Sequence, residues 1–119
     1  MTLLTAPSPS PSHDFLRSAE DAHTAHQLNF PETFDWFFRN GLVVKTTEFF
    51  LLAYADDAND CWVVWWLEAK PARSHRALLA LLLRHMPYYR PRVGWARPMK
   101  SKEFRYFSTD RLLAFTKGE

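Results

Sequence analysis

Hydrophobic positions spaced three and four residues apart favour a helix near the start of the chain. Phe15, Ala19 and Ala22 share one side of this helix, which is expected to begin near His13 and to end near residue 28. Ser12 precedes it as the expected cap. The remaining positions are mostly polar, so the helix is expected to be amphipathic.

A second, shorter helix is expected over residues 31–40. Pro31 suits a first helical turn, and Asn29 stands just before it as a cap. Three phenylalanines between residues 34 and 38 give the helix an apolar face. Gly41 is expected to end it, because glycine tolerates the left-handed conformation after a last turn.

From residue 42 onward, short apolar runs rich in β-branched and aromatic residues are typical of strands. Residues 42–44 and 49–54 predict two strands joined by a tight turn, and residues 56–60 predict a turn of Asp and Asn. Residues 61–69 are apolar on both faces, which predicts a strand in the middle of the sheet.

The longest helical pattern lies over residues 74–86. Ser74 is its expected cap, five leucines give it a broad apolar face, and Pro87 ends it. Three further strands are expected, at residues 92–97, 104–107 and 111–115. The last of these is alternatively a helix turn capped by Asp110.

These elements predict one small α+β domain over residues 13–119, with a mixed, mostly antiparallel sheet, two N-terminal helices and one long central helix. Residues 1–12, where Pro and Ser alternate near the end, are expected to form a flexible tail. A chain of 119 residues is long enough for one core. Neither a secretory signal nor an apolar window of about 18 residues is present, so we expect a cytoplasmic protein without membrane contact.

Charge divides the chain into two halves of opposite sign. Residues 1–69 hold three Lys or Arg against ten Asp or Glu, a net charge of −7, whereas residues 70–111 hold eleven against two, a net charge of +9. The asymmetry favours a basic face for an anionic partner, or pairing of the halves within one fold or between subunits. Aromatic residues make up 16%, which indicates a thick core or a contact surface.

The order of the expected elements resembles the GCN5-related N-acetyltransferase (GNAT) fold. The best local match is KPARSHRALL, residues 70–79, at the place where that family has its acyl-CoA loop before the long helix. The resemblance implies an acyl-CoA site and an amine-directed general base. The residues that would serve are Lys70, Arg73, Ser74 and Arg76 for the cofactor, Glu68 as base and Tyr106 as acid.

The same segment departs from the family pattern at both loop glycines. Arg73 and His75 stand at these positions, where glycine lets backbone N–H groups approach a pyrophosphate. We therefore expect a non-catalytic GNAT-like protein without a cofactor, which acts through protein contact or as a homo-oligomer. It is similar in this respect to small proteins of tailed phages, for which a virion location would follow. A degenerate acyl-CoA-dependent N-acyltransferase is the alternative.

A nucleic-acid-binding module is a further alternative, based on residues 88–111. Aromatic and basic side chains are interleaved there, and such residues bind bases and phosphates respectively. The candidate contacts to an anion or a partner are Arg92, Arg97, Lys100, Lys102 and Arg105.

Other chemistry has weaker support. His23 and His26 share a helix face, but two histidines without a fixed third ligand do not predict a metal site, and a solvated helix is expected. Cys61, the single cysteine, begins an apolar strand and is expected to be a small core residue. The chain has no Ser-His-Asp spacing, P-loop or dinucleotide fingerprint.

Overall fold

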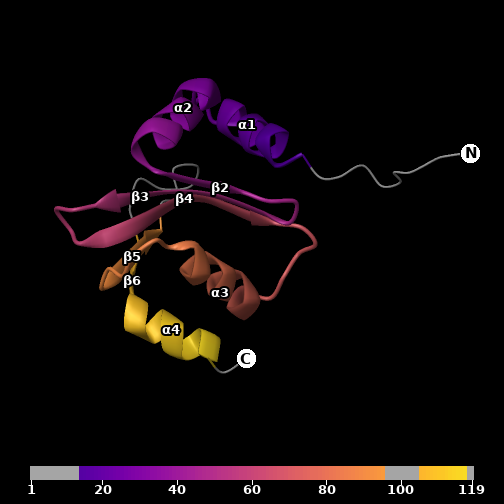
Figure 1. The fold of residues 1–119 in the computed structure, drawn as a ribbon. Helices are drawn as coiled ribbons and strands as arrows, with labels where there is room; N and C mark the ends of the chain where they lie inside the picture. The colour runs from indigo at the N-terminus through magenta and orange to yellow at the C-terminus, as the bar shows by residue number, and fades with distance from the viewer. Residues whose placement is uncertain (1–13, 96–104, 118–119) are drawn as a thin grey trace, which may run out of the picture.

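The protein has three layers, with a sheet between two pairs of helices (Figure 1). The computed structural model describes residues 14–95 and 105–117, so the expected tail lies outside the described residues. Helices α1 and α2 cover one face of the sheet, and α3 and α4 cover the other. The bounds of the helices are Phe15–Ala25 for α1, Phe30–Asn40 for α2, His75–His85 for α3 and Thr109–Lys117 for α4. This small α+β fold is the class that the sequence predicts.

Within the described residues, the sheet has five strands in the order β2, β3, β4, β5 and β6. Their bounds are Leu42–Lys45, Phe49–Asp56, Cys61–Ala69, Arg92–Trp95 and Arg105–Ser108. All neighbours are antiparallel except β4 and β5, which run parallel and are connected through α3. The mixed, mostly antiparallel sheet and the central place of β4 are therefore confirmed.

A β-bulge in β4 changes which of its residues face which helix layer. Val64 and Trp66 pair with consecutive residues of β3, so Trp65 between them is an extra residue. Strict alternation would place Glu68 on the same side as Trp62, toward α3. Because of the bulge, Glu68 instead lies on the side of α1, where it accepts a hydrogen bond from the indole of Trp66 and one from α1.

Each face of the sheet has its own apolar core. On the α3 side, Leu82 packs with Leu51 and Val93, all of them almost fully buried. On the other side, Phe15 of α1 and Phe37 of α2 pack with the inward-facing residues of β3. These two cores hold both helix layers on a sheet whose middle strands are buried on both faces.

The expected caps of two helices are confirmed, and that of α1 is different. The side chain of Asn29 accepts the N–H of Glu32, and that of Ser74 accepts the N–H of Ala77. Helix α1 is capped by Asp14, whose carboxylate accepts the N–H of residue 17 at 3.2 Å, and it ends at residue 25. Asp and Ser are equally good N-cap residues, so the sequence alone does not show which of Ser12 and Asp14 caps the helix. Ser12 lies outside the described residues.

The last predicted strand is wrong; the segment is helical, as the alternative has it, but Asp110 lies inside the helix and is not its cap. Residues 111–115 lie within α4, which begins one residue before Asp110. Its buried and half-buried positions are Thr109, Leu112, Leu113 and Thr116. They are three or four residues apart, the spacing of a helix that packs on one side. The N–H of Arg111 is 3.4 Å from the Ser108 hydroxyl, which caps the helix start.

Gly41 ends α2 as expected, but for a different reason. Its φ of −121° is extended backbone, which every residue adopts. A Cβ atom at this position would lie 2.6 Å from the carbonyl oxygen of Ala53 on β3. Glycine is required here because the helix end approaches the strand closely.

Candidate functional site

The segment before α3, where an acyl-CoA loop is expected, is bound to the turn between β2 and β3. The N–H of Lys70 donates to the Glu48 carbonyl at 2.9 Å, and the Arg73 guanidinium pairs with the Glu48 carboxylate at 2.8 Å. Ser74 caps the helix. Arg73, predicted to bind a cofactor, therefore already has an anionic partner on the protein.

Arg76, in the first turn of α3, points toward α4. Its guanidinium lies 4.7 Å from the centre of the Phe115 ring, and among the described residues its buried Nε has no hydrogen-bond partner. A CoA pyrophosphate needs bare main chain at a helix start, whereas Arg73 and His75 carry side chains here and Ser74 already accepts the N–H of Ala77. These residues do not fit the cofactor.

Glu68 and Tyr106, the expected base and acid, lie on separate parts of the sheet. Glu68 accepts the hydroxyl of Ser18 at 3.2 Å and therefore faces α1. Tyr106 on β6 lies opposite Gly94 of β5, which itself lies opposite Val63 of β4. Five positions of β4 separate Val63 from Glu68, and at about 3.3 Å per residue this is about 16 Å along the strand. The structure does not bring the two residues together.

The expected anion contacts are described only in part. Arg92 donates to the Asn59 carbonyl in the turn between β3 and β4, and its guanidinium lies 5.3 Å from the centre of the Tyr106 ring. Arg105 is exposed at the start of β6. The other three, Arg97, Lys100 and Lys102, lie outside the described residues.

Arg90 is an important cation that the sequence analysis did not single out. Its side chain is only 13% exposed, and it pairs with Asp57 and with Asp60 at 3.1 Å. Its guanidinium also lies over the ring of Tyr88. A hydrogen bond to the Tyr88 hydroxyl and the contact with Asp57 raise the pKa of Arg90. The pairing with Asp57 and Asp60 joins the turn between β3 and β4 to the segment before β5. The spacing in the sequence could not reveal a contact between turns so far apart along the chain.

His23 is buried, contrary to the expectation of a solvated helix face. Its Nδ1 lies 2.6 Å from the Ala19 carbonyl, and its Nε2 lies 2.9 Å from the indole nitrogen of Trp65. An indole N–H only donates, so Nε2 accepts and Nδ1 carries the proton. Burial lowers the pKa of His23 below its usual 6.5 and the neighbouring His26 adds to this, while the hydrogen bond to Ala19 partly opposes it. His23 is therefore a neutral structural side chain between α1 and β4.

Metal and thiol chemistry have no site in the described part of the chain. No group of three or more His, Cys, Asp or Glu side chains there could hold a metal ion. Cys61 is fully buried, and burial raises the pKa of its thiol, so it is the core residue that the sequence predicts.

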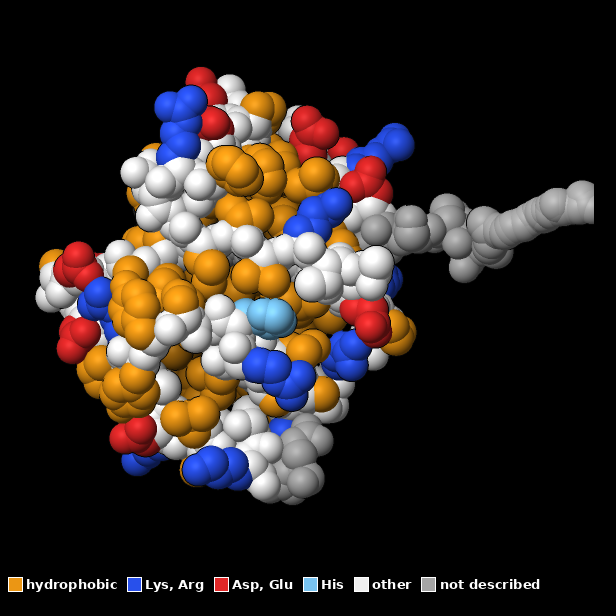
Figure 2. Space-filling model, in the orientation of Figure 1, with side chains coloured by type: hydrophobic (Ala, Val, Ile, Leu, Met, Phe, Trp, Pro, Cys, Tyr) orange, Lys and Arg blue, Asp and Glu red, His pale blue; other side chains and the backbone are white. Residues whose placement is uncertain are grey.

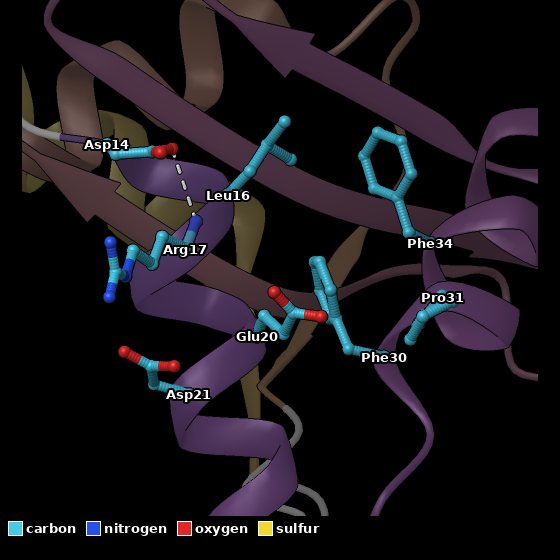
Figure 3. A pocket seen from close by; sticks show the side chains of 8 residues that line it. All are labelled: Asp14, Leu16, Arg17, Glu20, Asp21, Phe30, Pro31 and Phe34. Carbon is cyan, nitrogen blue, oxygen red and sulfur yellow. Dashed lines mark hydrogen bonds between the residues drawn. The ribbon is translucent and has the colours of Figure 1, made fainter.

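A groove of about 580 Å³ runs between α1 and α2 (Figure 3). Leu16 and the two phenylalanines of α2, Phe30 and Phe34, extend into the space between the helices. Glu20 and Asp21 lie along α1 at its margin. The groove thus combines an apolar floor with an acidic edge.

An aromatic ridge continues the groove along α2. Phe38 is 74% exposed, and its ring centre lies 6.4 Å from that of Phe34 in the groove. Figure 2 shows one group of hydrophobic side chains over α1 and α2 with charged side chains around it, and further hydrophobic groups lower on the same face. We call Phe34 and Phe38 the α2 ridge. A large, exposed apolar group next to acidic side chains is a feature of a contact surface.

A second hollow, which we call the α3–α4 pocket, lies on the opposite side of the sheet. It has a volume of about 400 Å³ and is lined by α3, α4 and the ends of β5 and β6. Apolar side chains such as Leu79, Trp95 and Phe107 form most of its wall, and Arg105 and His75 add polar groups. Its size is that of a site for a small molecule or for one large side chain.

Comparisons of the chain with protein-family models, with curated proteins and with solved structures found no match. None of the helices in the described ranges has the length and apolar character needed to cross a membrane.

Proposed function

We propose that this chain is a binding domain, arranged like the GNAT fold, that acts through contact with protein and not by acyl transfer. Two helices, three antiparallel strands, a crossover helix and a strand parallel to the third support the GNAT-like arrangement. The observation that carries the functional part is the α2 ridge, where Phe38 is three-quarters exposed beside an acidic groove. Aromatic side chains of this kind contribute much of the binding energy of protein interfaces.

The geometry of the expected catalytic site supports the same proposal. Arg73 is paired with Glu48, and Arg76 stacks on Phe115, so neither cation is directed at an open loop. The bulge at Trp65 moves Glu68 to the α1 side of β4, away from the start of α3. A base on one side of the sheet does not serve a cofactor on the other.

Calorimetric titration of the full chain with acetyl-CoA tests the proposal. We expect no binding heat at about 100 μM ligand, a concentration at which micromolar affinity is evident. Thiol release from acetyl-CoA with amine acceptors is measured in parallel for the natural chain and for Glu68→Gln. Micromolar binding, or thiol release that Glu68→Gln abolishes, would overturn the proposal in favour of the degenerate acyltransferase.

A further inference from the structure

We infer that copies of this chain associate head to tail, with the α2 ridge of one copy in the α3–α4 pocket of the next. The inference rests on the proposed function and names the partner, a second copy of the chain. The two surfaces lie on opposite faces of the sheet (Figure 1), so one molecule offers both at once.

The charges of the two helix layers are complementary. The layer of α1 and α2, residues 14–40, holds two Arg against five Asp or Glu, a net charge of −3. The described residues from 70 to 95 and from 105 to 117 hold nine Lys or Arg against one Asp. Without Arg73 and Arg90, which pair with acidic residues of the turns, seven cations against one Asp leave a net charge of +6. A second copy therefore presents to each face the opposite charge, which favours and orients the encounter.

The shapes of the two surfaces also match. Phe38 projects from α2 as an exposed ring, and the α3–α4 pocket of about 400 Å³ has an apolar wall that includes Phe107. Asp35 lies one helical turn before Phe38 and so on the same side of α2, where it pairs with Arg39 at 3.1 Å but stays 59% exposed, while exposed Arg105 lines the pocket. Insertion of the ring would bring acidic and basic side chains together around an apolar centre, as in known interfaces.

The geometry of such a contact determines the form of the assembly. The ridge and the pocket are different surfaces, so the contact is heterologous, and each added copy leaves one ridge and one pocket free. The assembly therefore grows into a ring or an open chain and is not limited to a closed two-fold dimer.

Sedimentation velocity of the full chain at increasing concentration measures the association. We expect the mass to increase with concentration, and to increase less at about 500 mM salt than at about 50 mM. Phe38→Ala is expected to raise the dissociation constant about ten- to hundredfold, because the contact would lose one buried aromatic ring. Tyr89→Ala is the control, because Tyr89 is 60% exposed but lies outside both surfaces.

A mixing experiment distinguishes this contact from general adhesion. Phe38→Asp removes the ridge and keeps the pocket, whereas Phe107→Asp blocks the pocket and keeps the ridge. Each variant alone is expected to be a monomer, and their mixture a dimer with one copy of each that does not grow further. Circular dichroism checks the fold of both variants, and Arg105→Glu, at an exposed position, replaces Phe107→Asp if that variant does not fold.

Several results would overturn the inference. These are a natural chain that is monomeric at about 100 μM, variants that remain separate when mixed, or a Tyr89→Ala effect as large as that of Phe38→Ala. Each of these results would still allow the proposed function, with a different protein as the partner. Binding of acetyl-CoA, in contrast, would overturn the proposed function whatever the oligomeric state.

Discussion

Acidification is expected to destabilise the protein through His23. The imidazole is fully buried between α1 and β4, and both of its nitrogens have partners that suit only the neutral ring. Protonation would place a new N–H of Nε2 against the indole N–H of Trp65. The folded state therefore holds His23 neutral at pH values where the unfolded chain binds a proton.

The lowered pKa fixes the direction and the pH range of this effect. Above 6.5, the usual pKa of histidine, His23 is neutral in both states and the full stability is present. Below 6.5 the unfolded state binds a proton that the folded state excludes, so stability decreases as the pH falls toward the folded-state pKa of His23. One such group changes the free energy of unfolding by at most about 1.4 kcal/mol per pH unit.

Urea unfolding from about pH 8 to about pH 5 measures the slope, with two glutamine variants as a matched pair. His23→Gln removes the titrating ring but retains an acceptor for Trp65, and it should remove this part of the pH dependence. His26→Gln changes an exposed histidine just after α1 and should retain most of the pH dependence, losing only the repulsion that His26 exerts on a protonated His23. The reasoning is refuted if His23→Gln leaves the slope unchanged, or if nitrogen NMR finds the proton on Nε2 in the folded protein.

Two further substitutions test the local packing. Gly41→Ala should lower the free energy of unfolding by about 1–3 kcal/mol. The reason is that the new Cβ would lie 2.6 Å from a carbonyl oxygen of β3. Urea unfolding measures the change, and an unchanged free energy of unfolding would contradict the prediction. Ser74→Ala should lower it by about 1 kcal/mol through loss of the cap of α3, and Ser74→Asp, which retains a capping oxygen, should restore it.

Local rules predicted most of the elements of this fold. Caps such as Asn29 and Ser74, and the helical spacing of leucines in α3, depend on neighbours within a few residues. The C-terminal segment was ambiguous because Leu112 and Leu113 fit a short strand as well as a helix. Packing of Leu112 beside α3, a contact distant in sequence, favours the helix.

The place of Glu68 on the sheet depends on a feature that the sequence does not display. Glu68 follows a run of apolar residues in which each position fits either side of the sheet, so no pattern shows where alternation is interrupted. The bulge at Trp65 reverses the side on which Glu68 lies. It also leaves the Trp65 indole N–H within reach of His23, a contact that joins residues 42 positions apart.

The fold uses the acidic and basic residues of the two halves in two ways. Some form ion pairs within the molecule, and the others remain on its outer faces. Acidic residues in turns are used within the fold, since Glu48 pairs with Arg73 and the turn residue Asp60 pairs with Arg90. The acidic residues of α1 and α2 lie across the sheet from the basic residues of α3 and α4, too far away to neutralise them directly. Net charge along the sequence could not distinguish these roles, because only the order of strands decides which charges meet. The charge that remains on opposite faces is available to the proposed head-to-tail contact, in which the α2 ridge and the α3–α4 pocket would supply the apolar part.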